Sequence, residues 1–196
     1  MTSIIKVDTI PDTAGNNIIN ENSNTITIGA SGDTTNIVGT LQNNGAAVGG
    51  TNTPNFHAYL NGDQTLPSDS ATKINFNAES WDTASAFDSS SNYRFTVPSG
   101  QAGKYIFTAT GGFSNADAGT AARYQLMFYK NNASSDFAGD FAQAQSASAD
   151  PTMNFTTQFD LSAGDYIDAR IYHNASSTET LQSAYARFFG YKLIGV

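Results

Sequence analysis

The side chains that could carry acid–base or nucleophilic chemistry are few in this sequence. There is no cysteine, which excludes thiolate nucleophiles, thiolate zinc sites and disulfides. The two histidines, His57 and His173, are not accompanied by an Asp or Glu in a known motif, so we expect structural roles for them rather than a pair of general bases. Serine is abundant, but no G-x-S-x-G motif surrounds one. The sequence therefore predicts a protein that is not an enzyme.

Carboxylates near the middle of the chain are the only candidates for metal binding. Asp136 and Asp140, with Asp117 and Asp150 nearby, have the oxygen ligands that Ca²⁺ prefers. Their spacing matches no EF-hand loop, and solvated loop carboxylates are the more ordinary interpretation. We expect no cofactor, with Ca²⁺ as the alternative.

Two segments are candidates for contacting a receptor. Trp81, the single tryptophan, lies beside Asp82 and could stack on a sugar face; alternatively it packs at the edge of a sandwich or in a subunit interface. Residues 131–151 form a Ser-, Ala- and Asp-rich insertion, expected to be a loop, whose Phe137 and Phe141 either pin it to the domain or contact a partner. The candidate receptor contacts are Trp81, Asp82, Asp136, Phe137, Asp140 and Phe141.

The elements that must position these residues fall into two parts. Residues 1–55 contain no Phe, Tyr or Trp, and all 13 Phe, nine Tyr and the Trp lie from Phe56 onward. Aromatic side chains carry the largest apolar area per residue, so a segment without them cannot build an ordinary core. We therefore predict two domains, an N-terminal arm at residues 1–55 and a head at residues 56–196.

The apolar residues of the arm favour short strands. They are mostly Ile and Val in small clusters separated by Gly, Asn and Asp, as in Thr25-Ile-Thr-Ile-Gly-Ala30. Such strands have too little apolar surface to be stable alone. Two interpretations follow: three copies intertwine and pool their Ile and Val residues, or the arm is disordered until a partner orders it.

The head shows the period-2 alternation of an antiparallel sandwich. Apolar and polar residues alternate along 73–78, 93–97, 105–109, 124–128, 153–161 and 167–171, with turn residues between them. The last predicted strand, 183–193, is aromatic on both faces, so one face needs cover from another copy. We predict an all-β homotrimer whose candidate interface residues are Tyr105, Tyr185, Phe189 and Tyr191.

The charge of the chain limits its partners. The net charge is −8, and the nine Lys and Arg residues form no run, so we expect no nucleic-acid partner. There is no apolar run long enough to cross a membrane and no basic-then-apolar N-terminus, so we expect neither membrane insertion nor a signal peptide. Together with the absence of cysteine, this favours folding in a reducing cytoplasm.

The head resembles the C1q-like domain, the trimeric jelly roll shared with the tumour necrosis factor superfamily. The segments that carry the resemblance, in chain order, are Phe56-His-Ala-Tyr59, Lys73-Ile-Asn-Phe-Asn-Ala78, Asn92-Tyr-Arg-Phe-Thr-Val-Pro98, Pro98-Ser-Gly-Gln-Ala-Gly-Lys-Tyr-Ile-Phe107, Leu161-Ser-Ala-Gly-Asp-Tyr-Ile167 and Phe188-Phe-Gly-Tyr-Lys-Leu193. This resemblance implies a C1q/TNF-like jelly-roll sandwich. No collagen-like Gly-X-Y stalk precedes the head, and the missing signal peptide and cysteines disfavour a secreted ligand.

The arm resembles the openings of virion appendage proteins of tailed phages. The segments that carry this resemblance are Ser3-Ile-Ile-Lys-Val-Asp-Thr-Ile-Pro-Asp-Thr-Ala-Gly15, Ile26-Thr-Ile-Gly-Ala-Ser-Gly-Asp33 and Gly39-Thr-Leu41. It implies a virion protein, assembled in the host cytoplasm, whose arm binds another virion protein. The candidate anchor residues are Ile4, Ile5, Val7 and Ile10. The head would recognise a host-surface glycan or protein, as in a tail fibre; the alternative is a capsid decoration, cement or head-fibre protein with the arm docked on the shell.

Overall fold

The regular structure of this protein is entirely β strand in the part of the chain that its computed structural model describes. That part comprises residues 9–11, 17–22, 25–28, 31–39, 41–43, 46–47, 52–114, 122–143 and 150–193. The chain divides into two compact units, Met1–Gly50 and Thr51–Val196. The all-β fold class predicted from the alternation is confirmed.

The first unit contains two small antiparallel sheets. One has the strands β1 (Thr9–Pro11), β2 (Asn17–Asn22) and β3 (Thr25–Ile28), and the other pairs β4 (Gln42–Asn43) with β5 (Ala46–Ala47). The register places Ile10 opposite Ile19 and Ile19 opposite Ile28. Of the anchor candidates, Ile10 lies in β1, whereas Ile4, Ile5 and Val7 lie outside the described residues.

Apolar side chains of the first unit are open to solvent. Ile28 is 54% exposed, Val38 is 94% exposed, and Ile37 and Leu41 are each about half exposed at 48%. A single copy of this segment therefore leaves apolar surface uncovered, which is the condition that both interpretations of the arm require.

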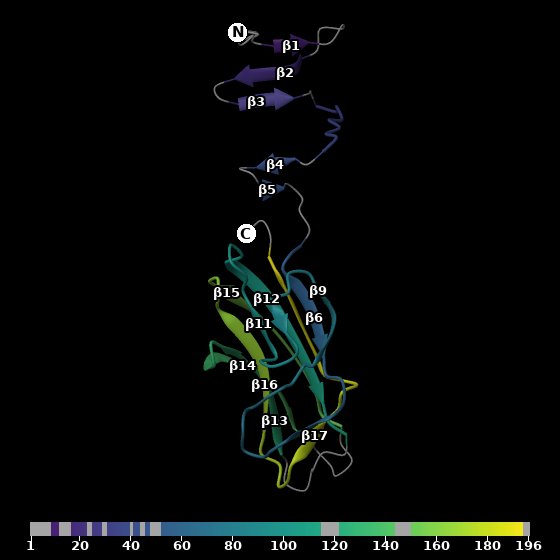
Figure 1. Cartoon of the computed structure of the whole chain (residues 1–196), viewed down its shortest axis with the longest axis vertical. Coiled ribbons are helices and arrows are strands. Elements are labelled where there is room, and N and C mark those ends of the chain that lie inside the picture. Colours follow the sequence, from purple (N-terminus) through teal and green to yellow (C-terminus); the bar gives the residue numbers. More distant parts are fainter. Residues whose placement is uncertain are drawn as a thin grey trace. The chain divides into compact units, whose positions relative to one another are not determined.

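The head is a sandwich of two antiparallel sheets (Figure 1). The β18 sheet has the strand order β15 (Thr152–Leu161), β12 (Gly103–Gly112), β18 (Arg187–Lys192), β6 (Asn55–Tyr59) and β9 (Ala78–Asp82). The β16 sheet has the order β10 (Phe87–Asp88), β11 (Arg94–Thr96), β16 (Tyr166–His173), β13 (Arg123–Lys130) and β14 (Ala133–Gln143), with β8 (Thr72–Lys73) also paired to β16. A further pair joins β7 (Gln64–Leu66) to β17 (Glu179–Leu181).

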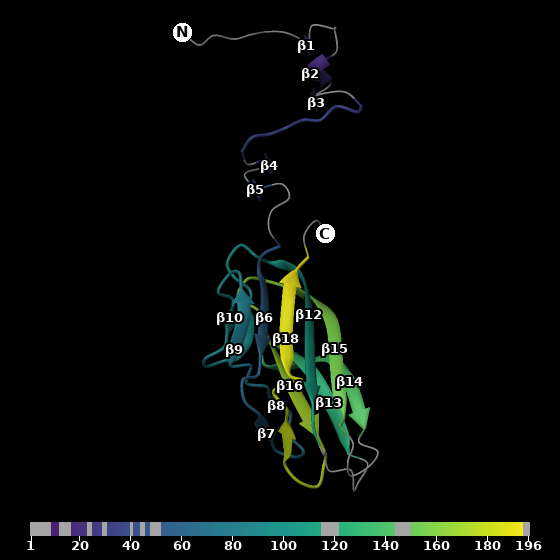
Figure 2. The same ribbon diagram turned by 90° about the vertical axis from the view of Figure 1, so that its right-hand side faces the viewer.

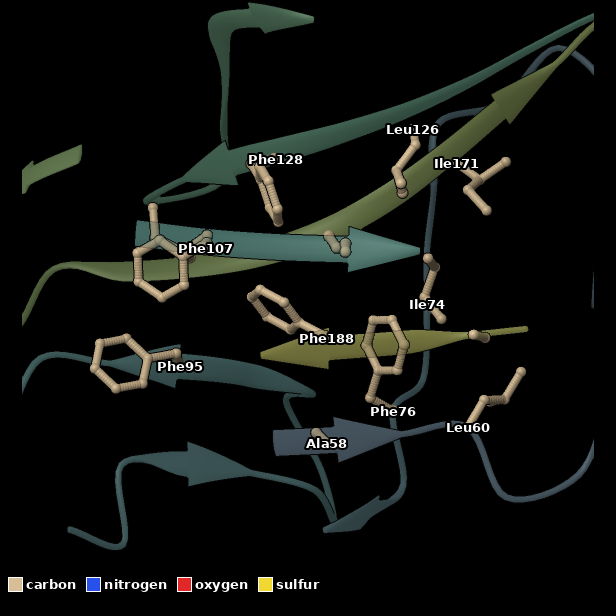
Figure 3. Close-up of a cluster of buried hydrophobic side chains, with 14 of the residues drawn as sticks. Ala58, Leu60, Ile74, Phe76, Phe95, Phe107, Leu126, Phe128, Ile171 and Phe188 are labelled. Atoms are coloured by element: carbon tan, nitrogen blue, oxygen red, sulfur yellow. The ribbon is translucent and has the colours of Figure 1, made fainter. Parts of the chain in front are cut away.

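The core between the sheets is built from the inward residues of the predicted alternation. Phe95, Phe107 and Phe188 come from three strands (Figure 3). The ring centroid of Phe107 lies 5.4 Å from that of Phe95 and 6.0 Å from that of Phe188. The predicted alternation at residues 73–78 does not correspond to one strand: Lys73 ends β8, Ala78 begins β9, and the residues between them are a connection. This connection still buries Ile74 and Phe76. Each such side chain stabilises the fold by roughly 1.5–3 kcal/mol through burial.

One predicted loop is wrong. The insertion at residues 131–151 begins with the turn residues Asn131 and Asn132, both with positive φ, and then forms β14, which pairs with β13 at the edge of the β16 sheet. Its Ser-, Ala- and Asp-rich composition shows no alternation and therefore gave no strand prediction. Backbone pairing to β13 supplies the hydrogen bonds that composition could not reveal.

The turn before β16 explains one of the motifs that resemble the C1q-like domain. Gly164 has a φ of +88°, which favours glycine, and the Asp165 carboxylate accepts the N–H of Ser162 at 2.9 Å. Asp165 also accepts a hydrogen bond from Asn131 Nδ2 at 2.8 Å and pairs with Lys130 Nζ at 2.9 Å. The Asn131 bond, followed by these other contacts, lowers the pKa of Asp165 to about 2.

The glycine of the closing strand is required by close packing. A Cβ on Gly190 would lie 2.4 Å from Cδ1 of Phe107 and 2.9 Å from the carbonyl oxygen of Ile106. The Phe107 ring therefore occupies the space that any side chain at position 190 would need. Neighbouring Phe188 points into the core and Phe189 away from it, as strand geometry dictates.

We predict that Gly190→Ala lowers the free energy of unfolding of the head by about 1–3 kcal/mol, because the added methyl group overpacks the Phe107 site. Chemical denaturation monitored by tryptophan fluorescence measures the change. Ala102→Ser, which adds one atom at an exposed position, is the matched control and should stay within about 0.5 kcal/mol of the parent. Equal stability of the Gly190→Ala variant and the parent would show that the core yields at this point.

Candidate functional site

The outward face of the β18 sheet, which we call the β18 face, carries a continuous row of side chains. The register places Trp81 of β9 opposite His57 of β6, His57 opposite Phe189 of β18, and Phe189 opposite Thr108 of β12. Thr108 lies opposite Thr156 of β15, and their hydroxyl groups are 2.8 Å apart. One row therefore crosses all five strands of this sheet. Figure 2 shows the ribbon of the sheet with β18 in front.

Three rings of this row stack on one another, and we call Trp81, His57 and Phe189 the aromatic row. The His57 ring centroid lies 4.9 Å from that of Trp81 and 5.9 Å from that of Phe189. Trp81 Nε1 donates to Asn55 Oδ1 at 2.8 Å, and Nδ1 of His57 lies 2.9 Å from Ser80 Oγ. The row is therefore fixed in orientation, although Trp81 remains 52% exposed.

Further aromatic side chains extend the β18 face along β18 and the loop before it. Tyr191 is 37% exposed and lies opposite Ile106 of β12. Tyr185, in the loop before β18, is 46% exposed and lines a shallow depression of about 440 Å³ with Thr110 and Met153. This concentration of exposed rings on one sheet is the kind of surface that a partner normally covers.

Three of the four predicted interface residues lie on or beside the β18 face, and one does not. Phe189, Tyr191 and Tyr185 occupy the positions just described. Tyr105 is a correction: it points into the core, is 0% exposed, and donates from its hydroxyl group to the carbonyl oxygen of Gln101. Burial raises the pKa of Tyr105 to about 12. Sequence alternation gave two equivalent faces and could not tell which one is inward.

The predicted receptor contacts are separated by the fold. Trp81 lies on edge strand β9 in the aromatic row, and therefore on a strand rather than in a loop. Asp82 holds the following turn, because its carboxylate accepts the N–H groups of Ala84 at 3.1 Å and Phe87 at 2.7 Å. The remaining candidates lie in β14, and their side chains are outside the described part of the chain; they are Asp136, Phe137, Asp140 and Phe141.

The two histidines occupy different environments and do not form one site. His57 lies on the β18 face, whereas His173 of β16 is fully buried, stacks on Tyr124, and has Nε2 3.1 Å from the carbonyl oxygen of Leu66.

Among the described residues, no group of three or more His, Cys, Asp or Glu side chains is arranged to hold a metal ion. Of the calcium candidates, Asp117 is not described, and Asp150 is exposed. No helix suited to crossing a membrane occurs in the described residues.

Solved structures similar to this chain share the jelly-roll fold. The globular domain of zebrafish complement 1qA matches with a TM-score of 0.52 and 19% sequence identity, covering 72% of this chain and 98% of that domain. Eiger TNF from S. frugiperda matches with a TM-score of 0.51 and 13% identity, over 72% of this chain and 93% of the other. Murine APRIL at pH 8.0 matches with a TM-score of 0.50 and 13% identity, over 71% and 98%.

These likenesses establish the fold of the head: it is a C1q/TNF-like jelly roll, as its sequence motifs predict. No protein-family model and no curated protein matches the sequence. At sequence identities of 13–19% the similarity concerns the fold, and the function has to be inferred from the surfaces of this chain.

The aromatic row should make the stability of the head depend on pH. Partial burial, followed by the positive charge of Arg187, lowers the pKa of His57 below its ordinary value. The unfolded chain then binds a proton more readily than the folded chain, so the free energy of unfolding falls as pH drops below about 6.5. Besides Arg187, the groups against the ring are Trp81, Phe189 and Ser80.

We predict that the parent loses more stability than His57→Gln between about pH 7.5 and about pH 5, because the variant lacks the titrating imidazole while His173 is present in both. Denaturant unfolding at the two pH values, at one protein concentration, gives the comparison. If both proteins lose the same stability, His57 does not sense pH and the dependence belongs to other groups.

Proposed function

We propose that this protein is a non-enzymatic, homotrimeric virion appendage of a tailed phage. Its arm attaches to another virion protein, and its head is displayed to recognise a glycan or protein on the host surface, as in a tail fibre or receptor-binding protein. The arm supports the virion assignment through the segments quoted above, and the head supports it because a jelly roll is a rigid scaffold on which surfaces can vary.

The observation that supports a trimer is the exposed aromatic surface of the β18 face. Trp81, Phe189 and Tyr191 present aromatic area to solvent in a single copy, and burying each would contribute roughly 1.5–3 kcal/mol. A specific interface needs about 800 Å² from each partner, and one face of a five-stranded sheet can supply an area of that order. Closed threefold symmetry would cover the face in every copy and leave no unfilled contact.

The exposed apolar residues of the first unit support the same arrangement. Ile28, Val38 and Leu41 are about half exposed or more in a single copy. Three arms together could bury them, which a trimeric head would favour by holding the arms at high effective concentration. Three heads would also convert a weak single-site contact with a host surface into a tight one through avidity.

We predict that the full chain sediments as a trimer and that Phe189→Asp shifts it to monomers, because a charge in the middle of the covered face would be desolvated without a partner. Analytical ultracentrifugation measures both. Tyr105→Phe is the matched control: it removes a buried hydroxyl group, should cost about 1 kcal/mol of stability, and should remain trimeric. A monomeric parent at micromolar concentration would contradict the trimer.

The appendage role is tested on particles. A label on the chain, imaged on intact virions, should mark the tail, and the purified trimer should compete with virions for adsorption to host cells. Label on the capsid faces together with no competition would overturn the receptor-binding role and leave capsid decoration.

A further inference from the structure

The outward face of the β16 sheet gathers cations that are scattered in the sequence. Four of the nine Lys and Arg residues lie on it: Lys73 of β8, Arg94 of β11, Arg123 of β13 and Arg170 of β16. Their neighbours Ile74, Phe95, Tyr124 and Ile171 are buried in the core, which fixes the four cations on the opposite side. In a chain of net charge −8 with nine basic residues this is a concentration of cations, and Asp168 on the same face pairs with two of them, Lys73 and Arg170.

Each arginine of this face lies over a tyrosine ring. The guanidinium carbon of Arg94 is 3.8 Å from the ring centroid of Tyr166, that of Arg170 is 3.9 Å from Tyr129, and that of Arg123 is 5.3 Å from Tyr172. These separations are within the range of cation–π contacts. We call this set the Arg–Tyr ladder; its members are Arg94, Arg123, Tyr129, Tyr166, Arg170 and Tyr172.

A buried carboxylate holds the middle of the ladder in place. Asp168 is 0% exposed, and its oxygens lie 2.6 Å from Arg170 Nε and 3.1 Å from Lys73 Nζ. Arg170 also donates to Asn132 Oδ1 at 2.6 Å. At one end of the ladder, the Tyr172 hydroxyl group donates to Asp69 at 2.9 Å. The side chains are therefore preorganised, which lowers the entropy cost of binding a ligand.

The chemistry of the ladder suits sugars that carry carboxylates. A guanidinium lying over a ring keeps N–H donors at its edge, and such donors match a carboxylate in two parallel hydrogen bonds. The donors of Arg170 are already bonded to Asp168 and Asn132, so Arg94 and Arg123 are the guanidinium groups that would meet a ligand carboxylate. Tyrosine presents a flat apolar surface and a hydroxyl group at low entropy cost, as binding hot spots do. The outward positions of β16 from Tyr166 to Tyr172 span about 20 Å at about 3.4 Å per residue, which is longer than one sugar unit.

The ladder differs from the β18 face in how its aromatic rings are covered. Its tyrosine rings lie under guanidinium groups, and none of its members is among the exposed large apolar side chains of the described residues. The two faces lie on opposite sheets of the sandwich. In a trimer closed through the β18 face, the ladder would point away from the symmetry axis and remain open to solvent.

We propose that the Arg–Tyr ladder binds an acidic polysaccharide, a glycan chain whose sugars carry carboxylate groups. This inference rests on the proposed host-recognition function and names the ligand class and the surface. Nucleic acid is the competing polyanion; its dense phosphates would be repelled by the rest of an acidic chain, whereas a sparser row of carboxylates can meet the ladder alone.

Affinity electrophoresis of the full chain tests the proposal, with polygalacturonate as the acidic probe, dextran as the neutral probe and double-stranded DNA as the other polyanion. Polygalacturonate should retard the parent, and dextran and DNA should not. The double variant Arg94→Gln/Arg123→Gln should bind polygalacturonate about tenfold or more weakly, because it loses two charge-assisted contacts.

Two further variants test whether binding depends on the ladder itself or on the net charge of the protein. Lys192→Gln removes one cation at the end of β18, outside both the ladder and the β18 face, and should bind as the parent does. Arg94→Lys/Arg123→Lys keeps the charge but loses the planar donors, and should bind between the parent and the double Gln variant. Both double variants should sediment as the parent does, since Arg94 and Arg123 lie outside the core and the β18 face.

The outcomes distinguish this inference from the proposed function. If the parent competes for adsorption but does not bind polygalacturonate, or if the double Gln variant binds it equally well, the ladder is not the site while host recognition stands. Equal binding to DNA would show a general polyanion surface and overturn the assignment to polysaccharide. A parent that does not compete for adsorption removes the proposed function, whatever it does with polygalacturonate.

Discussion

The ring of Phe107 lies within 6.3 Å, centroid to centroid, of six other aromatic rings contributed by both sheets. Its edge fills the space where a side chain of Gly190, its partner in the paired strand β18, would lie. Because the ring contacts both layers, it sets which side of β18 is inward. Phe188 must then face the core and Phe189 must face away from it. The position of the aromatic row therefore follows from how one core phenylalanine packs.

The two outward faces of the sandwich have opposite chemistry although the strands beneath them are alike. The β18 face carries stacked and exposed rings around His57, whereas the β16 sheet pairs its rings with guanidinium groups and a buried carboxylate. Apolar area favours association with an identical surface, and oriented charge favours a ligand of opposite sign. One small fold can thus assemble through one sheet and recognise through the other, which is how the two proposals fit together.

The sequence predicted the architecture well because alternation and turn chemistry are local. The strands around Phe95, Tyr105 and Phe159 and the turn at Gly164 follow from neighbouring residues alone. What could not be predicted depends on register between distant strands. The ladder joins residues from Arg94 to Tyr172, and the basic residues therefore looked scattered. The burial of Tyr105 and the backbone role of Asp82 depend on inward direction and on turn geometry, which spacing does not encode.

The strict alternation of β16 has a consequence for how such a protein can diversify. Ile167, Ala169 and Ile171 hold the core, while the residues between them face outward. Among the outward residues Asp168 is buried and paired with Arg170 and Lys73, so its codon is constrained like those of the core, whereas the codons of Tyr166 and Tyr172 can change with less penalty to folding. Lineages that share this scaffold would differ mostly at the outward positions, so selection for a new host could act on a few sites without first rebuilding the domain.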